Sequence, residues 1–414
     1  MTSFILGRGK NFCRSCDSPD LFSALDLGCL PIANELWENT EISSEIFPLH
    51  LRICKSCGLG QVEDVVAPSR LFRDYRYLSS VSSSFVEHAK AFVDAMLESN
   101  TVAREDWVLE IASNDGYLLQ HFIEKGIDVL GVEPARNVAK IAVEKGIPTV
   151  SDFFGTSLAT TIQKERGYPK LIIANNVMAH VPDIQDFVAG LAKMSGPNTL
   201  ISIENPSLIN LLKANQFDTI YHEHYSYLTA NAVRHIAESF GLELFEVELV
   251  ATHGGSNRYW LRPKTNNGQL VAIQGIVDEE IQEGLLSEKH WQDFANRIQT
   301  NLSAFHAWVK ERYECGTTVC GFGAAAKAST LLNAARIEKN WITCIADTSN
   351  EKQGRFMPSL GIPIVSPAKM FEMLPSEIIV FPWNIKDEIG NQIRKNLGAK
   401  VNIWQAVPHL EMIA

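Results

Sequence analysis

Apolar runs alternate with amphipathic segments through most of the chain, and this pattern predicts two α/β regions. Short apolar runs read as buried strands, and the segments between them carry apolar side chains at helical spacing. This alternation predicts a parallel, doubly wound sheet that binds ligands at the carboxyl ends of its strands. The first region comprises predicted strands at Trp107–Ala112, Val129–Val132, Leu171–Ala174 and Thr199–Ile203, and helices at Ser83–Glu98, Tyr117–Lys125, Val138–Lys145 and Ile184–Lys193.

The second alternating region follows a polar stretch at Thr265–Gly268 and a charged helical segment at about Val277–Lys310. Its predicted strands and helices are Thr318–Phe322, a helix from about Ala326, Trp341–Ala346, Glu377–Phe381, a helix at about Lys386–Leu397, and Lys400–Ile403. The segment before about Ser69 has little periodicity, and we expect it to be loop-rich and unable to bury much core alone. The fold class is therefore α/β, with predicted domains at 1–70 (a small N-terminal module), 71–265 (the first α/β domain), 266–300 (a helical linker) and 301–414 (the second α/β domain).

Composition supports a multidomain globular enzyme. The chain has 414 residues, 46% hydrophobic and 21% charged, and single cores seldom exceed about 250–300 residues. Its net charge of −11 argues against broad nucleic-acid or membrane-surface binding. No secretory h-region and no apolar run of roughly 20 residues is found, so we expect a cytoplasmic protein.

Four of the eight cysteines form two CxxC pairs, Cys13/Cys16 and Cys54/Cys57. Two intervening residues let both thiolates of a pair face one ion, and two such pairs complete a tetrahedral Zn²⁺ site. Four thiolates leave no open coordination position, so the zinc would be structural; the alternative is four unrelated cysteines. We expect the remaining cysteines to be ordinary buried apolar residues: Cys29, Cys315, Cys320 and Cys344.

Acidic side chains follow successive predicted strands and indicate a nucleoside site. The turn from Glu110 to Gly116 carries carboxylates that would repel a pyrophosphate but tolerate the cationic S-adenosylmethionine (SAM). Glu133 follows the next strand, where an acid can bind ribose hydroxyls. Asp152 is placed to bind adenine, and Phe153 to stack on it. A different nucleotide fold is the alternative, and Glu133 alone would read as a solvated loop acid.

Two further clusters carry groups suited to proton transfer. Asn175 to Asp183 follows a predicted strand and places His180 near the methyl donor. Tyr221 to Tyr227 holds two histidines, one glutamate and three tyrosines. His222 and His224 would share one face of a strand, which leaves a metal site open, as well as a merely polar loop.

Together these motifs resemble the family of SAM-dependent 3-C-methyltransferases that act on nucleotide-linked 4-keto-deoxysugars, and the resemblance covers essentially the whole chain. Its carriers are the paired CxxC motifs, Tyr75 to Ser80, Glu110 to Gly116, Asn176 to Asp183, Tyr221 to Tyr225, His253 to Ser256, and Gly321 to Lys327. One departure is Ala112, where this family usually has glycine; we expect the extra methyl to shift cofactor affinity without abolishing the site.

The resemblance implies a role for each candidate residue. His224 would be the general base, Tyr221 and Glu223 would shape the sugar pocket, and His180 and Tyr75 would flank the reacting centre. The cofactor site would comprise Ser80, Glu110, Ser113, Asn114, Asp115, Gly116, Glu133, Asp152, Phe153, Asn175 and Asn176. The nucleotide diphosphate would lie on the Gly-rich turn, a suitable anion site, with Gly321, Gly323 and Lys327, and more weakly Asn333, Asp347, Lys352 and Asn384.

The predicted reaction is methylation of C3 of a nucleotide-linked 4-keto-6-deoxysugar, through an enolate formed by His224. The carrier would be dTDP or GDP, and the sequence does not choose between them. Two alternatives are an O- or N-methyltransferase for another small molecule and a zinc-ribbon protein that binds nucleic acid. The acidic net charge opposes the second, and we expect neither nucleic acid nor membrane as a partner.

Overall fold

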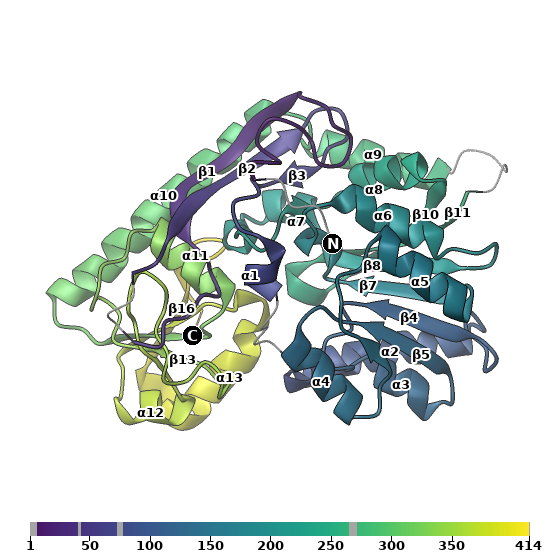
Figure 1. Cartoon of the computed structure of the whole chain (residues 1–414). Coiled ribbons are helices and arrows are strands. Elements are labelled where there is room, and N and C mark those ends of the chain that lie inside the picture. The colour runs from purple at the N-terminus through teal and green to yellow at the C-terminus, as the bar shows by residue number, and fades with distance from the viewer. Residues whose placement is uncertain (1–5, 40–42, 73–77, 265–270, 414) are drawn as a thin grey trace.

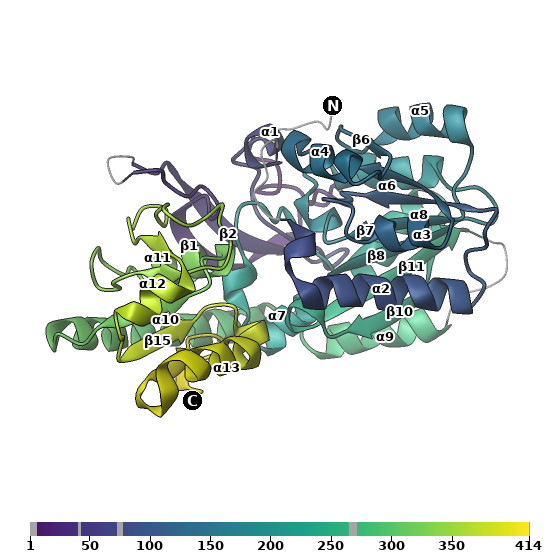
Figure 2. The ribbon, with the colours of Figure 1, turned by 90° about the horizontal axis from the view of Figure 1, so that it is seen from below.

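The computed structural model describes residues 6–39, 43–72, 78–264 and 271–413, and contains three sheets. The N-terminal sheet is antiparallel, in the order β1 (Leu21–Pro31), β2 (Ile46–Cys54), β3 (Gly60–Gln61), β9 (Ser226–Tyr227). β1 and β2 lie between the two α/β parts of the molecule (Figure 1; Figure 2). The last strand of this sheet therefore comes from a distant part of the sequence.

The long β1–β2 pair corrects the expectation of a loop-rich N-terminal segment. The register shifts between Ser23 and Leu25 and again between Asp26 and Cys29. Such bulges interrupt the inside–outside alternation, so the sequence lacks the period-2 signal of a strand. β1 packs against the long helix α10 (Glu288–Glu314), whose Trp291 is fully buried in the shared core. As expected, this segment does not build a core by itself.

The central sheet has the order β10-β11-β8-β7-β4-β5-β6. Its parallel strands are β4 (Trp107–Ile111), β5 (Asp128–Val132), β6 (Thr149–Val150), β7 (Leu171–Asn175) and β8 (Leu200–Pro206). An antiparallel hairpin that the sequence pattern missed, β10 (Leu242–Val250) and β11 (Ser256–Pro263), extends this sheet beside β8. Four of the parallel strands, β4, β5, β7 and β8, match those predicted, whereas the two-residue β6 was not predicted. Their carboxyl ends meet along one edge.

Helices cover both faces of the central sheet, as its apolar clusters show (Figure 1). One face is covered by α2 (Ser83–Glu98), α3 (Leu119–Glu124) and α4 (Arg136–Glu144). The other is covered by α5 (Thr156–Arg166), α6 (Ile184–Lys193), α8 (Ala230–Ser239) and α9 (Val271–Gln282). Ser82 begins α2 and Asp183 begins α6 by accepting backbone N–H groups of the first turn.

The C-terminal sheet has the order β14-β13-β12-β15-β16-β17. Its strands are β12 (Val319–Phe322), β13 (Ile345–Ala346), β14 (Ile364–Val365), β15 (Glu377–Val380), β16 (Asn402–Gln405) and the antiparallel β17 (Glu411–Met412). Its helices are α11 (Ala326–Ala334), α12 (Pro367–Glu372) and α13 (Lys386–Leu397). The predicted strand Trp341–Ala346 is real only at its last two residues.

Short helices complete the chain: α1 (Pro68–Phe72), α7 (Leu208–Lys213) and the 3-10 turns η1 (Ser79–Val81), η2 (Met178–His180), η3 (Phe217–Thr219), η4 (Thr252–Gly254), η5 (Trp383–Ile385) and η6 (Gly398–Lys400). In the part of the chain that the structure describes, no helix combines the length and apolar character needed to cross a bilayer. The predicted α/β fold class is confirmed. The domain boundaries stay predictions, and the N-terminal sheet includes β9, which lies within the predicted second domain in sequence.

Candidate active site

The turn after β4 holds its backbone in the left-handed region. Ala112, Asn114 and Gly116 have φ values of 56°, 50° and 78°. A Cβ on Gly116 would lie 2.0 Å from Cδ1 of Ile147, and glycine adopts this positive φ without strain. At Ala112 the methyl group carries a backbone cost of about 1–2 kcal/mol, in addition to the added bulk that we expected to matter.

Glu133, directly after β5, ties this turn to the neighbouring strand end. Its carboxylate accepts the N–H of Asn114 at 3.0 Å and the N–H of Ala135 at 2.8 Å. Burial raises the pKa of Glu133 to about 7, although these two bonds oppose the shift. The residue that the sequence predicted to bind the ribose is thus a buried carboxyl group at the carboxyl end of β5.

Glu110 adds a second buried carboxyl group. Burial, followed by the charges of Glu133 and Asp115, raises its pKa well above the ordinary value. Its Oε2 has no hydrogen-bond partner among the described residues. Acidic groups with an unpaired acceptor suit a cationic ligand that also donates hydrogen bonds, so the residues around this turn fit SAM by their own chemistry.

Asp115 connects the turn to the segment before α2. It accepts the backbone N–H of Ser80 at 3.3 Å and also its hydroxyl, and pairs with Lys145 Nζ at 2.8 Å. Ser79 N–H donates to Asn114 Oδ1 at 2.9 Å. Two predicted cofactor residues, Asp115 and Asn114, therefore also dock the entrance to α2.

The remaining predicted cofactor residues occupy different environments. Ser113 packs against Gly131 in β5, since a Cβ there would lie 2.4 Å from its Oγ. Asp152 is exposed and accepts the N–H of Phe153 at 2.8 Å. Asn176 has a φ of 53° at the end of β7, and the Oδ1 of Asn175 has no hydrogen-bond partner within the described ranges.

The Tyr221–Tyr225 segment orients His224 between two oxygen atoms. Nδ1 of His224 lies 2.9 Å from the carbonyl oxygen of Thr219, and Nε2 lies 2.9 Å from the hydroxyl of Tyr221. A carbonyl only accepts, so Nδ1 carries the proton and Nε2 is the basic nitrogen.

His180 and Glu223 complete this cluster. The rings of His180 and His224 have centroids 4.6 Å apart, and Nδ1 of His180 donates to the carbonyl of Glu223 at 2.7 Å. Burial lowers the pKa of His180 to about 4, which keeps it neutral at pH 7. The Glu223 carboxyl instead accepts from Asn34 at 3.0 Å, and burial raises its pKa to about 7.

His222 belongs to a different environment from His224. The segment is not a strand, and the His222 ring turns to the carbonyl of Phe47, 3.2 Å from Nε2. Within the described residues the only group with metal-ligand geometry is the cysteine cluster, so the metal interpretation of these histidines is not supported. The predicted catalytic residue Tyr75 lies outside the described residues.

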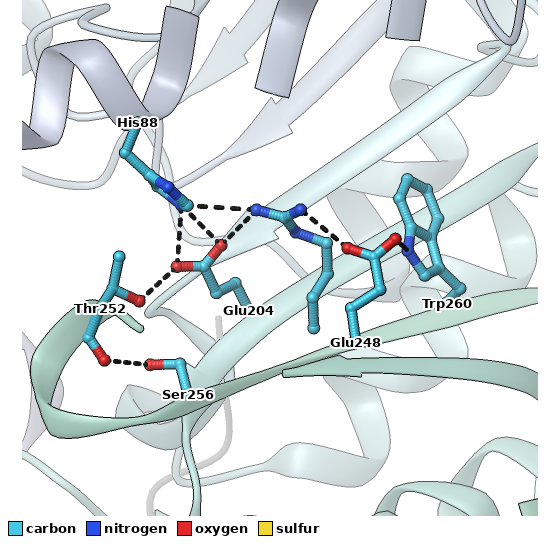
Figure 3. Close-up of polar contacts among 7 residues, drawn as sticks. His88, Glu204, Glu248, Thr252, Ser256 and Trp260 are labelled. Carbon is cyan, nitrogen blue, oxygen red and sulfur yellow. Dashed lines mark hydrogen bonds and ion pairs between the residues drawn. The ribbon is translucent and has the colours of Figure 1, made fainter. Parts of the chain in front are cut away.

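A buried polar network at the carboxyl end of β8 was not predicted (Figure 3). Glu204 accepts from His88 at 3.0 Å, from Arg258 at 2.7 Å and from Thr252 at 2.9 Å. Burial alone would raise the pKa of Glu204, but His88 and Arg258 outweigh it and lower that pKa to about 2. The network joins α2, β8, β11 and η4, whose sequence separation hides the partners from any local pattern.

The predicted anion turn follows β12 in the C-terminal sheet. Gly323 has a φ of 90°, and a Cβ there would lie 2.4 Å from the ring of Pro382. Asp347 accepts the N–H of Ala324 at 2.9 Å and pairs with Lys352 at 3.1 Å. A Cβ on Gly321 would lie 2.4 Å from Phe381. Three predicted nucleotide residues thus surround one turn: Gly323, Asp347 and Lys352.

Lys327 lies where the C-terminal sheet meets the histidine segment. Its Nζ is 4.0 Å from the ring centroid of Trp383 and 3.0 Å from Oδ1 of Asn384. Trp383 donates from Nε1 to the buried Asp218 at 2.8 Å, six residues before His224. Asn333 is placed differently, near the end of α11, where it donates to the carbonyl of Ser329. Sequence reasoning missed Trp383 and Asp218 because only the tertiary fold joins them.

The two CxxC pairs converge as predicted. Sγ–Sγ distances are 3.5 Å for Cys13–Cys57 and 3.6 Å for Cys16–Cys54, and all four atoms lie within 4.8 Å of one another. Zn–S bonds of about 2.3 Å give tetrahedral edges of about 3.8 Å, so the cluster fits zinc. Cys320 and Cys344 are buried as expected, but Cys29 and Cys315 are exposed, on a bulged strand and after α10.

Three family matches cover most of the chain. Residues 13–72 match a zinc binding domain, residues 85–247 a methyltransferase domain, and residues 251–408 a C-methyltransferase C-terminal domain. The chain is also 33% identical over 380 residues to C-methyltransferase NovU from Streptomyces niveus, which spans 91% of this chain and 90% of that protein.

Solved structures match a smaller part. Magnesium protoporphyrin IX methyltransferase (ChlM) from Synechocystis PCC 6803 with bound SAH covers 44% of this chain and 83% of its own, at 14% identity and a TM-score of 0.34. The PH0226 protein from Pyrococcus horikoshii OT3 covers 47% of this chain and 98% of its own, at 12% identity and a TM-score of 0.36.

Proposed function

Since the chain belongs to the family of C-methyltransferases with an N-terminal zinc-binding domain, we propose that it methylates C3 of a nucleotide-linked 4-keto-6-deoxysugar. The family confirms the sequence-based identification of a SAM-dependent methyltransferase with a zinc-binding domain. The substrate, the methylated carbon and the roles of individual residues form the proposal.

The geometry of His224 supports the choice of base. A C4 ketone acidifies the C3 hydrogen, and a neutral imidazole can remove such a proton near pH 7. The Thr219 carbonyl holds the proton on Nδ1 and leaves the lone pair on Nε2. His224 therefore takes the C3 proton at Nε2, and the C3–H electron pair becomes the enolate. This orientation is the observation that carries the proposal.

Groups around His224 stabilise the enolate. The hydroxyl of Tyr221, 2.9 Å from Nε2, donates to the enolate oxygen, a contribution of about 3 kcal/mol for a well-placed donor. His180 stays neutral and close, so it adds no positive charge that would lower the basicity of His224. When bound, SAM supplies the electrophilic methyl group that C3 receives. Glu110, Glu133 and the turn before Gly116 hold and orient that cofactor.

The second α/β sheet holds the nucleotide. Lys327 and the backbone of the turn after β12 form an anion site for the diphosphate. Trp383 links this turn to Asp218 in the segment before His224, so the carrier and the sugar ring align across two domains. We expect Lys327→Gln to raise the KM for the nucleotide sugar at least tenfold and to leave SAM affinity unchanged.

Deuterium exchange tests the assignment directly. With a nucleotide-linked 4-keto-6-deoxysugar deuterated at C3, the wild-type enzyme should release deuterium and form a 3-C-methyl product detected by NMR. His224→Asn should bind SAM normally but lose both exchange and methylation. Unchanged washout in His224→Asn would exclude it as the base. Running dTDP- and GDP-linked substrates side by side identifies the carrier.

The same exchange experiment distinguishes C-methylation from O- or N-methylation. An O- or N-methyltransferase needs no ketone and exchanges no C–H proton, so methylation without loss of deuterium from C3 would support that alternative. The cytoplasmic location remains a prediction.

A further inference from the structure

We propose that Arg14, between Cys13 and Cys16, is a positioning residue. It would set the distance between two loops: the His180 loop, residues 178–183, and the His224 loop, residues 221–225. The zinc-binding domain of residues 13–72, called the zinc module below, would then hold His180 and His224 in position as well as stabilise the fold. This inference rests on the proposed function through the role of His224.

One guanidinium contacts both loops. Arg14 lies between Cys13 and Cys16 and is fully buried. Its Nη1 donates to the carbonyl of Pro182 at 3.0 Å, two residues after His180. Its Cζ lies 5.5 Å from the ring centroid of Tyr225, the residue after His224. A planar, multiply donating group is suited to hold two elements in a fixed relation.

Arg14 is itself held rigidly. Its Nη2 pairs with the fully buried Asp64 at 2.7 Å and also donates to the carbonyl of Val62. Its backbone N–H donates to Oε1 of Gln61 at 2.9 Å, and Gln61 in turn donates to the carbonyls of Gly9 and Phe12. Zinc ligation of the flanking cysteines would fix the same backbone.

The N-terminal sheet also connects the zinc module to the His224 loop. β9 begins immediately after Tyr225 and pairs with β3, three residues after Cys57. The N–H of Val62 donates to the carbonyl of Tyr225 at 3.1 Å. The His224 loop therefore ends as a strand of the zinc-module sheet, and Glu223 within it accepts from Asn34 of that module.

The energetics favour a positioning role over a purely stabilising one. Removing two charges from water is expensive, and a buried ion pair often stabilises a fold no better than apolar side chains of equal volume. Arg14 Nε also lacks a hydrogen-bond partner among the described residues. What apolar substitutes cannot reproduce is the directed bond to Pro182 and the fixed distance to Tyr225.

Two variants test this inference. Arg14→Lys keeps the charge beside Asp64 but loses the planar donor pair, and Arg14→Met removes the charge. Arg52→Lys, on the half-exposed face of β2 in the same module, is the matched control. Zinc content, SAM dissociation constant, kcat and KM are measured, together with NMR signals of ¹⁵N-labelled histidine rings assigned through His180→Asn and His224→Asn.

We expect both Arg14 variants to keep zinc and to bind SAM with wild-type affinity. Their kcat should fall at least tenfold, and the NMR signals of the His180 and His224 rings should shift. Arg52→Lys should change none of these. Wild-type kcat and ring signals in both Arg14 variants would overturn the proposal, as would loss of zinc or folding in both. The NMR readout needs no substrate, so it still tests Arg14 if no ketosugar is methylated and the proposed function fails.

Discussion

Nδ1 of His224 lies 2.9 Å from the carbonyl oxygen of Thr219. Because this bond fixes the tautomer, the opposite nitrogen is the basic one, and it faces Tyr221. The orientation of the His224 ring is therefore set by a backbone atom five residues earlier.

Replacing Tyr221 with phenylalanine should slow methylation without weakening cofactor binding. The change removes the donor 2.9 Å from Nε2 and leaves the ring in place. Loss of one donor to a developing oxyanion lowers kcat by about 10²–10³-fold. Steady-state kinetics and calorimetry with SAM measure the two effects. A wild-type kcat would show that another group stabilises the enolate.

SAM affinity should fall as the pH drops below about 7. Burial raises the pKa of Glu133 to about 7. In the proposed site the ribose hydroxyls donate to its ionised form, so the SAM affinity should fall by up to tenfold for each pH unit below this pKa. Calorimetry between pH 8 and pH 5.5 measures this slope. Glu133→Gln should bind more weakly with a flatter pH dependence, whereas the exposed Glu124→Gln should behave as wild type. An unchanged slope in Glu133→Gln would contradict the assignment.

Glu204→Gln should destabilise the protein at pH 7 but not near pH 2. The pKa of Glu204 falls from an ordinary 4.5 to about 2 in the fold, which corresponds to about 3 kcal/mol. This contribution is complete above pH 4.5 and is lost as the pH falls through about 2. Urea unfolding at several pH values measures the difference from wild type. Glu144→Gln, in an exposed pair with Lys140, should lower the free energy of unfolding by less than about 0.5 kcal/mol. An equal loss in the two variants would contradict the stabilising role of the Glu204 network.

Ala112→Gly should stabilise the fold by up to about 1.5 kcal/mol. Relief of the left-handed strain at a φ of 56° gains about 1–2 kcal/mol, and the greater freedom of glycine in the unfolded chain removes about 0.5–1 kcal/mol. The matched control Ala304→Gly, in the exposed interior of α10, should instead lose about 1 kcal/mol. Equal destabilisation of both variants would contradict this account.

The sequence alone predicted the longer parallel strands, because each is a short apolar run flanked by amphipathic helices, but it missed the two-residue strands β6 and β14. It predicted the zinc cluster from the spacing of its cysteines, and the sites after β4 and β5 from acids at strand ends. These features are local, since the period of a strand or a knuckle is complete within a few residues. The bulged pair β1–β2 escaped prediction because the bulges erase that period.

Only the tertiary structure decided which distant groups meet. Arg14 reaches Pro182 and Tyr225, Trp383 reaches Asp218, and His88 reaches Glu204, although each pair is more than 100 residues apart in sequence. The fold also separated His222 from His224, which the sequence pattern would have placed on one face. Burial and hydrogen-bond direction depend on the packing of the whole chain, so the tautomer of His224 and the charge state of Glu204 could not be read from their neighbours in sequence.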